Sequence, residues 1–256
     1  MTTAPIDCSA PPVLILLHGA GANQAMWNAV RRHLDPRWPV VALDLPGHGS
    51  QADGHYTFEA AVETVTAAVR QAAPARVVLV GDSLGGYTSM ASALVIARER
   101  LAGLAIGGCT QNFEGKALRG LRRTALMTRV LLALFNPKKL VAKSGDKLVK
   151  KGIARADMDA MIAANLRMQG YLEAVQSIAH RDFLSKVPAI EAPILFINGD
   201  LDKGAVAHEA EFVAAARDAR AQRFPCEHGV SLWMPAEFAA ATNRFVDSLM
   251  AARVPA

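Results

Sequence analysis

Residues 77–86 read Val-Val-Leu-Val-Gly-Asp-Ser-Leu-Gly-Gly, and this stretch decides the fold. The four apolar residues at its start predict a buried strand, and a helical pattern begins directly after the serine. Between them lies Gly81-x-Ser83-x-Gly85, the motif of a sharp strand-to-helix turn that exposes a serine oxygen above a sheet. The positions of Gly81 and Gly85 crowd one another in such a turn, so only small residues fit there. The stretch therefore predicts an α/β sheet with Ser83 as a candidate nucleophile.

Short apolar runs alternate with helical patterns along the rest of the chain. Continuous apolar runs predict strands buried on both faces at Val13–Leu17, Val40–Leu43, Val77–Val80, Leu104–Ile106 and Ile194–Ile197. The weaker run Ala221–Phe224 predicts an edge strand. Helices are predicted near residues 26–34, 57–72, 84–99, 205–217 and 235–251. This alternation predicts a doubly wound, mainly parallel sheet of about six strands, with helices on both faces.

The alternation breaks between Thr110 and Pro188. Helical periodicity continues there without a convincing strand, and a second helical pattern spans Met158 to Ser177. We interpret residues 110–188 as an inserted helical lid. Residues 1–109 and 189–256 are then the two parts of one α/β core.

Composition excludes several classes of protein. With 256 residues, 52% hydrophobic and 20% charged, the chain is long enough for one large globular α/β domain. No apolar run reaches the roughly 20 residues that a membrane-spanning helix needs, and no secretory signal peptide is recognisable. The chain has three cysteines, Cys8, Cys109 and Cys226. An odd number of cysteines without the spacing of metal ligands indicates a reducing compartment. We expect a cytoplasmic protein without disulfides or a bound metal.

The net charge of +5 is unevenly distributed. Residues 110–190 contain 15 Lys and Arg against 6 Asp and Glu, whereas the remainder contains 13 against 17. Two interpretations stay open: a solvated helical face, or a surface that attracts anionic substrates, carriers or lipid headgroups. No nucleic-acid-binding module accompanies these charges, which argues against a nucleic-acid partner. No sequence pattern indicates the oligomeric state.

Acyl transfer by a serine needs a base, an acid that orients the base, and N–H donors for the developing oxyanion. Asp202 follows the predicted strand Ile194–Ile197, and His228 follows the last predicted strand. Because parallel strands end at one rim of a sheet, both side chains are expected near Ser83. Asp200, two residues before Asp202, remains the alternative acid.

These motifs resemble, in order and over nearly the whole chain, the α/β-hydrolase superfamily. The resemblance rests on His18-Gly19-Ala20-Gly21 with Trp27, on Asp44-Leu45-Pro46-Gly47-His48-Gly49-Ser50, on Gly199-x-x-Asp202, on His228-Gly229 and on Pro235-x-x-Phe238. It implies a serine hydrolase that cleaves a carboxylic ester through an acyl-enzyme, with a Ser-His-Asp triad and no cofactor. The spacing from Gly199 selects Asp202 as the acid. By the same likeness the backbone N–H groups of Ala20 and Leu84 form the oxyanion hole.

The resemblance also suggests a subgroup. Few residues precede Val13, so we expect the antiparallel hairpin that usually begins this family to be absent, as in the plant methylesterase and hydroxynitrile-lyase group. The lyases carry threonine in place of Gly19 and lysine in place of Gly229, so these two glycines favour ester hydrolysis. A hydroxynitrile lyase, a C–C bond hydrolase and a triad-bearing small-molecule receptor remain alternative functions on this scaffold.

Three further polar residues lie close to the motifs. Asp82 directly precedes Ser83, but the turn is expected to point its side chain away from the site, in a structural role. His18 and His48 lie in glycine-rich loops, and we expect them to hold the shape of these loops rather than to exchange protons.

Overall fold

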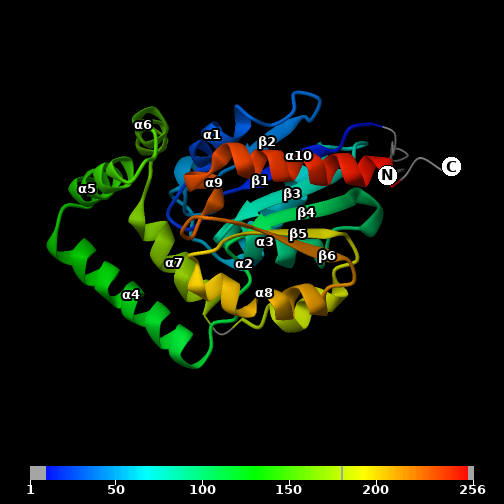
Figure 1. Ribbon diagram of the computed structural model, residues 1–256. Coiled ribbons are helices and arrows are strands. Elements are labelled where there is room, and N and C mark those ends of the chain that lie inside the picture. Colours follow the sequence, from blue (N-terminus) through cyan, green and yellow to red (C-terminus); the bar gives the residue numbers. More distant parts are fainter. Residues whose placement is uncertain (1–9, 180, 253–256) are drawn as a thin grey trace.

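The computed structural model describes residues 10–179 and 181–252, and in this part of the chain six strands form one sheet (Figure 1). The strands are β1 (Val13–Leu17), β2 (Val40–Leu43), β3 (Val77–Asp82), β4 (Leu101–Gly107), β5 (Ile194–Gly199) and β6 (Ala219–Phe224). Their order is β2-β1-β3-β4-β5-β6, and each neighbouring pair is parallel. The predicted α/β sheet is therefore confirmed.

The helices of the described residues flank this sheet and extend beyond it. They are α1 (Asn28–Arg31), α2 (Phe58–Gln71), α3 (Leu84–Ala93), α4 (Gly115–Leu134), α5 (Pro137–Lys150), α6 (Arg155–Ala163), α7 (Met168–Ile178), α8 (Lys203–Ala215), α9 (Val230–Trp233) and α10 (Pro235–Ala251). Short 3₁₀ helices occur at η1 (Gln24–Trp27), η2 (Gly49–Gln51), η3 (Arg98–Arg100) and η4 (Leu184–Ala189).

Each face of the sheet has its own hydrophobic core, because successive strand residues point to opposite sides. Leu14, Leu16 and Val80 belong to one core, which α1 and α10 cover with side chains such as Val30 and Phe238. Their neighbours Ile15, Leu17 and Leu79 belong to the other core, which α2, α3 and α8 cover. Helices thus cover both faces, as the continuous apolar runs predicted.

The two edge strands differ from the central ones. Strand β6 lies at one edge of the sheet, and residues such as Arg220 and Arg223 are exposed there, which confirms the predicted edge strand. The prediction that Val40–Leu43 is buried on both faces is wrong. This strand forms the opposite edge of the sheet, pairs only with β1, and leaves Val41 exposed. An apolar run does not reveal whether a strand has neighbours on both sides.

Two helix boundaries also differ from expectation. The helix predicted over residues 84–99 ends at Ala93, and the apolar residues that suggested its continuation, Leu94 and Val95, are exposed. The helix predicted over residues 26–34 is split into η1 and α1. The Asn23 side chain begins η1 by accepting a hydrogen bond of 3.1 Å from the Ala25 N–H.

Helices α4 to α7 all lie between β4 and β5 in the chain. They extend to one side of the sheet, on the left of Figure 1, from α6 at the top to α4 at the bottom. We call residues 110–188 the helical segment; its boundaries as a separate unit remain a prediction. None of the helices in the described residues is long and apolar enough to cross a membrane. The hairpin expected to be absent before Val13, and Cys8, concern residues 1–9, which lie outside the described residues.

Candidate active site

Ser83 occupies the turn between β3 and α3 with a strained backbone. Its φ of 55° and ψ of −113° are values that non-glycine residues rarely adopt. The next residue, Leu84, begins α3, so the positive end of this helix lies beside the serine. Such strain persists only where surrounding packing holds it, and it is typical of functional turns.

The packing around this turn explains its glycines. A methyl group added at Gly81 would overlap the carbonyl of Gly85, and one added at Gly85 would overlap the carbonyl of Leu17 on β1. Gly19 lies on the other side, where an added methyl group would stand 3.6 Å from Cβ of Ser83. The turn therefore packs tightly against β1 and against the loop that follows β1, and side chains at Gly81 and Gly85 would not fit.

Asp202 and His228 meet at the carboxyl ends of β5 and β6. Nδ1 of His228 lies 2.5 Å from Oδ2 of Asp202. The other oxygen of Asp202 accepts a hydrogen bond of 3.2 Å from the N–H of Ala205, so the carboxylate also caps the N-terminus of α8. This second bond fixes the carboxylate that faces the imidazole.

The environment of this pair favours its charged form. Burial alone would lower the pKa of His228, but the hydrogen bond to Asp202 and the nearby charge of Asp82 raise it above its usual value. Burial opposes ionisation of Asp202 as well, yet the hydrogen bond from His228 lowers its pKa below the usual range. An imidazolium formed at His228 is therefore stabilised by the neighbouring carboxylates.

The alternative acid, Asp200, lies elsewhere. Its side chain is exposed, and its backbone N–H donates to the carbonyl of Phe224 at 2.7 Å. Of the two carboxylates, only Asp202 is hydrogen-bonded to His228.

The prediction that Asp82 points away from the site is wrong. Asp82 is buried beside His228, lines the same cavity as Ser83, and accepts a hydrogen bond from the hydroxyl of Ser231. Its second oxygen, Oδ1, has no hydrogen-bond partner among the described residues. Burial raises the pKa of Asp82. The position before a serine on a tight turn was too weak a pattern to fix the direction of this side chain.

One cavity of about 370 Å³ brings the candidate residues together. Ser83, Asp202 and His228 all line it, as do Gly19 and Ala20. No hydrogen bond joins Ser83 to His228 among the described residues. Catalytic hydrogen bonds are often long in unliganded sites and tighten when substrate binds.

The candidate oxyanion donors sit on either side of Ser83. The N–H of Leu84 is the first of α3 and has no acceptor within its helix. The Leu84 side chain is fully buried and does not line the cavity, so only its backbone can take part. Ala20 lines the cavity, and its N–H has no acceptor among the described residues. Both amides are thus available to an oxygen that approaches the serine.

His18 and His48 hold the loops beside these donors. Nε2 of His18 accepts a hydrogen bond from the N–H of Leu45 at 3.0 Å, and Nε2 of His48 accepts one from Gly21 at 3.1 Å. Burial and the neighbouring His48 imidazole lower the pKa of His18 to about 3, and burial also lowers the pKa of His48. Both rings are thus neutral hydrogen-bond acceptors that connect neighbouring loops.

A family model for the alpha/beta hydrolase family matches residues 14–241. The chain belongs to this family. The match includes each motif described above, from the loop after β1 to the first turns of α10.

Three comparisons show where this alpha/beta hydrolase stands among its relatives. It is 28% identical to a pimeloyl-[acyl-carrier protein] methyl ester esterase of Vibrio vulnificus, over 75% of this chain and 76% of that protein. It is 44% identical to an esterase of Mycobacterium tuberculosis, but over only 32% of this chain and 28% of the relative. The structure of MenH from S. aureus matches with a TM-score of 0.77 at 15% identity, over 97% and 99% of the two chains. This last likeness shows the fold alone.

The cavity of this hydrolase has an apolar wall that sequence reasoning did not predict. Its members all come from the helical segment: Phe113, Leu121, Tyr171, Val175 and Ile178. Leucine and valine at helical spacing look the same whether they face a core or a substrate, so no pattern distinguished them.

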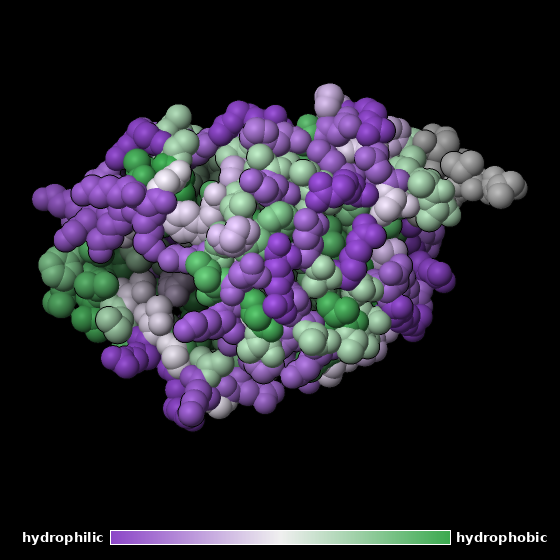
Figure 2. Space-filling view, viewed as in Figure 1, coloured by the Kyte–Doolittle hydropathy of each residue, from purple (hydrophilic) through white to green (hydrophobic). Residues whose placement is uncertain are grey.

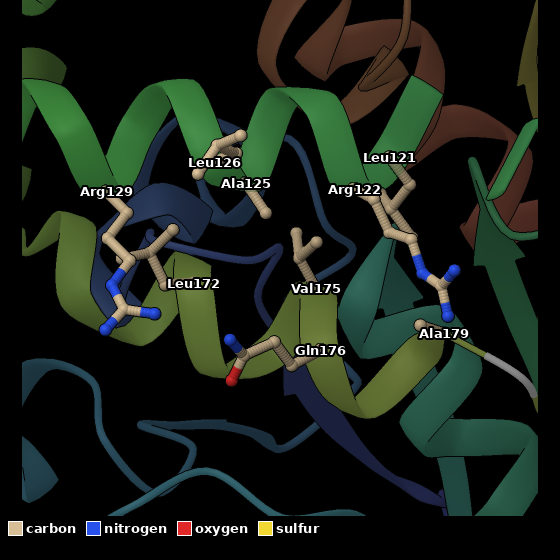
Figure 3. A pocket seen from close by; sticks show the side chains of 9 residues that line it. All are labelled: Leu121, Arg122, Ala125, Leu126, Arg129, Leu172, Val175, Gln176 and Ala179. Carbon is tan, nitrogen blue, oxygen red and sulfur yellow. The ribbon is translucent and has the colours of Figure 1, made fainter. Parts of the chain in front are cut away.

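A second hollow, of about 380 Å³, lies between α4 and α7 (Figure 3). We call it the α4–α7 groove. Leu121 and Val175 line both this groove and the cavity of Ser83. Its middle is lined by apolar side chains and by Gln176, and Arg122 and Arg129 stand toward its two ends. In the described part of the chain, no cluster of three His, Cys, Asp or Glu residues could hold a metal ion.

Proposed function

We propose that this protein hydrolyses a carboxylic ester with Ser83 as nucleophile, His228 as base and Asp202 as the acid that orients it. The observation that carries the proposal is the 2.5 Å pair of His228 and Asp202, which lines the same cavity as Ser83. The strained turn at Ser83 supports it, as do the two relatives named as esterases. A methyl ester is one candidate, because the Vibrio relative is named for such a substrate.

The reaction follows from these positions. The Ser83 hydroxyl attacks the ester carbonyl while His228 accepts its proton, and Asp202 stabilises the resulting imidazolium. The carbonyl oxygen becomes an oxyanion, which the N–H groups of Ala20 and Leu84 stabilise. His228 then protonates the departing alcohol and leaves an acyl group on Ser83. Water, deprotonated by His228, hydrolyses this acyl-enzyme and restores the serine.

The helical segment supplies the lid in this proposal. Leu121 on α4 and Val175 and Ile178 on α7 give the cavity an apolar lining beside its polar residues. Such a wall binds the hydrocarbon part of an ester and excludes water from the charged intermediate.

The charge of the helical segment favours an anionic ester. Arg129 lines the α4–α7 groove, which shares Leu121 and Val175 with the cavity of Ser83. A substrate whose tail lies in this groove would carry a carboxylate or phosphate within reach of the guanidinium group of Arg129.

Turnover on a panel of substrates tests the proposed reaction. The panel contains esters of graded acyl length, a thioester, a lactone and a cyanohydrin. We expect many turnovers per protein molecule on at least one ester and no release of cyanide. Binding without turnover would support a receptor instead, and cyanide release from the cyanohydrin would support a lyase.

A further inference from the structure

The outer side of α4 carries an exposed apolar stripe. Ten large hydrophobic side chains are prominently exposed in the described residues, and six of them lie within ten positions: Leu126, Met127, Val130, Leu131, Leu134 and Phe135. Leu134 is 71% exposed and Phe135 is 55% exposed. Figure 2 shows hydrophobic surface gathered at the left edge, over the end of α4. This concentration is unlike the scattered apolar residues of an ordinary surface.

The stripe is additional to the apolar side on which α4 packs. Leu121 and Ala125 point toward α7 (Figure 3). Of the stripe, only Leu126 also lines the α4–α7 groove, and the other five residues do not line it. The second half of α4 is therefore apolar on nearly all sides, a pattern of helices surrounded by apolar material. The fold covers only one of these sides.

Positive charge surrounds the stripe. Residues 115–151 contain eleven Lys and Arg but only one acidic residue, Asp146. On α5, Val141 and Gly145 are buried, whereas the lysines Lys138, Lys139, Lys143, Lys147 and Lys150 are exposed. The lysines begin directly after the apolar stripe ends at Phe135. A partner for this surface must therefore offer both negative charge and apolar contact.

We propose that the α4–α5 corner, residues 126–143, docks on an anionic lipid surface. Such a surface supplies negative headgroups for the lysines and hydrocarbon for the stripe, which is how amphipathic basic helices bind at a bilayer interface. A second copy of this chain fits poorly, because it would bring two strongly positive segments together. The corner stands at the outer edge of the molecule, a convex shape suited to shallow insertion into a bilayer (Figures 1 and 2).

The docked surface adjoins the site. Leu126 belongs to the apolar stripe and also lines the α4–α7 groove. A lipid surface at the corner would therefore lie beside that groove, which shares Leu121 and Val175 with the cavity of Ser83. This position would let a lipophilic molecule pass from the bilayer to the protein without crossing water.

Sedimentation with lipid vesicles tests the docking. The full-length protein is mixed with vesicles of phosphatidylglycerol, which is anionic, or of phosphatidylcholine, which has no net charge. One variant carries Leu134→Ser and Phe135→Ser. The matched control is Val95→Ser, because Val95 is 63% exposed but lies outside the helical segment. Hydrolysis of a short water-soluble ester is measured for each protein, since none of these residues lines the cavity of Ser83.

We expect the wild type and Val95→Ser to bind phosphatidylglycerol vesicles, with binding that weakens as salt is added. The double variant should bind at least about tenfold more weakly while its activity on the soluble ester stays the same. Equal binding to both lipids, equal loss in the Val95 control, or no binding to either lipid would overturn the proposal. Capture of a purified acidic acyl-carrier protein without vesicle binding would also overturn it, in favour of a protein partner.

Discussion

Ser83 holds a backbone conformation that serine rarely adopts, and the surroundings show what maintains it. Gly81 and Gly85 leave no room for side chains, and α3 begins immediately after the serine. In the same cavity, Asp202 is hydrogen-bonded both to His228 and to the Ala205 N–H at the N-terminus of α8. Asp202 is thus held by two contacts, the kind of support that keeps a side chain in place before a substrate arrives.

The choice between the two carboxylates can be tested directly. Asp202→Asn removes the charge that stabilises a protonated His228, and in a serine triad this change costs about 10⁴-fold in turnover. The control is Asp200→Asn, two residues away on an exposed side chain. We expect the control to keep turnover within about tenfold of the wild type. Equal losses in the two variants, or a larger loss at Asp200, would refute the assignment.

Among the residues that line the candidate site, those that belong to sequence motifs could be predicted, and those outside motifs could not. Ser83 and His228 have neighbours of distinctive type, so their positions on one rim could be anticipated. Asp82 was placed wrongly because the direction of its side chain depends on Gly108, Gly229 and Ser231, which come from distant parts of the chain. The apolar lining residues carry no local signal.

The turn at Ser83 packs directly against β1, and this contact between two elements should limit which residues the turn accepts. Gly85→Ala would drive a methyl group into the backbone of Leu17, which cannot move without disturbing the sheet. We expect unfolding free energy to fall by about 3 kcal/mol, the upper end for overpacking. Gly120→Ala is the control, because this glycine lies in α4 with open space around it.

The control should stabilise the protein by about 0.5–1 kcal/mol, since alanine favours helix over glycine. Urea denaturation of the two variants measures both effects. A Gly85→Ala protein as stable as the wild type would show that the turn is less tightly packed than the structure indicates.

Element boundaries were less predictable than element types. Five strands carry long enough apolar runs to be recognised, yet β2 was taken for a central strand because its run resembles theirs. The helix after Ser83 ends at Ala93 because the chain there turns toward η3, although Leu94 and Val95 suggested that it continues. The order of the strands and the points where the chain turns back depend on contacts between elements that are far apart in the sequence. A short stretch of sequence therefore does not reveal them.

At the scale of the whole molecule, the charge of the helical segment is the main feature apart from the fold. If this charge attracts substrate, an anionic ester should have a higher kcat/KM than a neutral ester of the same shape. The preference should decrease severalfold at high salt, because exposed charges are screened over about 8–10 Å near physiological ionic strength. Arg129→Gln should reduce the preference, whereas Arg70→Gln, on α2 outside the helical segment, should leave it unchanged.

A preference that stays constant with salt would contradict this expectation. The basic residues would then only solvate the helical segment, the other interpretation that the sequence left open.

Turnover of Ser83→Ala on the best ester of the panel tests most directly whether Ser83 is the nucleophile. The matched control is Ser92→Ala, a buried serine of α3 whose hydroxyl has no hydrogen-bond partner among the described residues. We expect Ser83→Ala to lose on the order of 10⁶-fold in kcat while it unfolds at nearly the wild-type temperature, and Ser92→Ala to stay active. A folded Ser83→Ala protein with more than about a tenth of wild-type turnover would contradict the account.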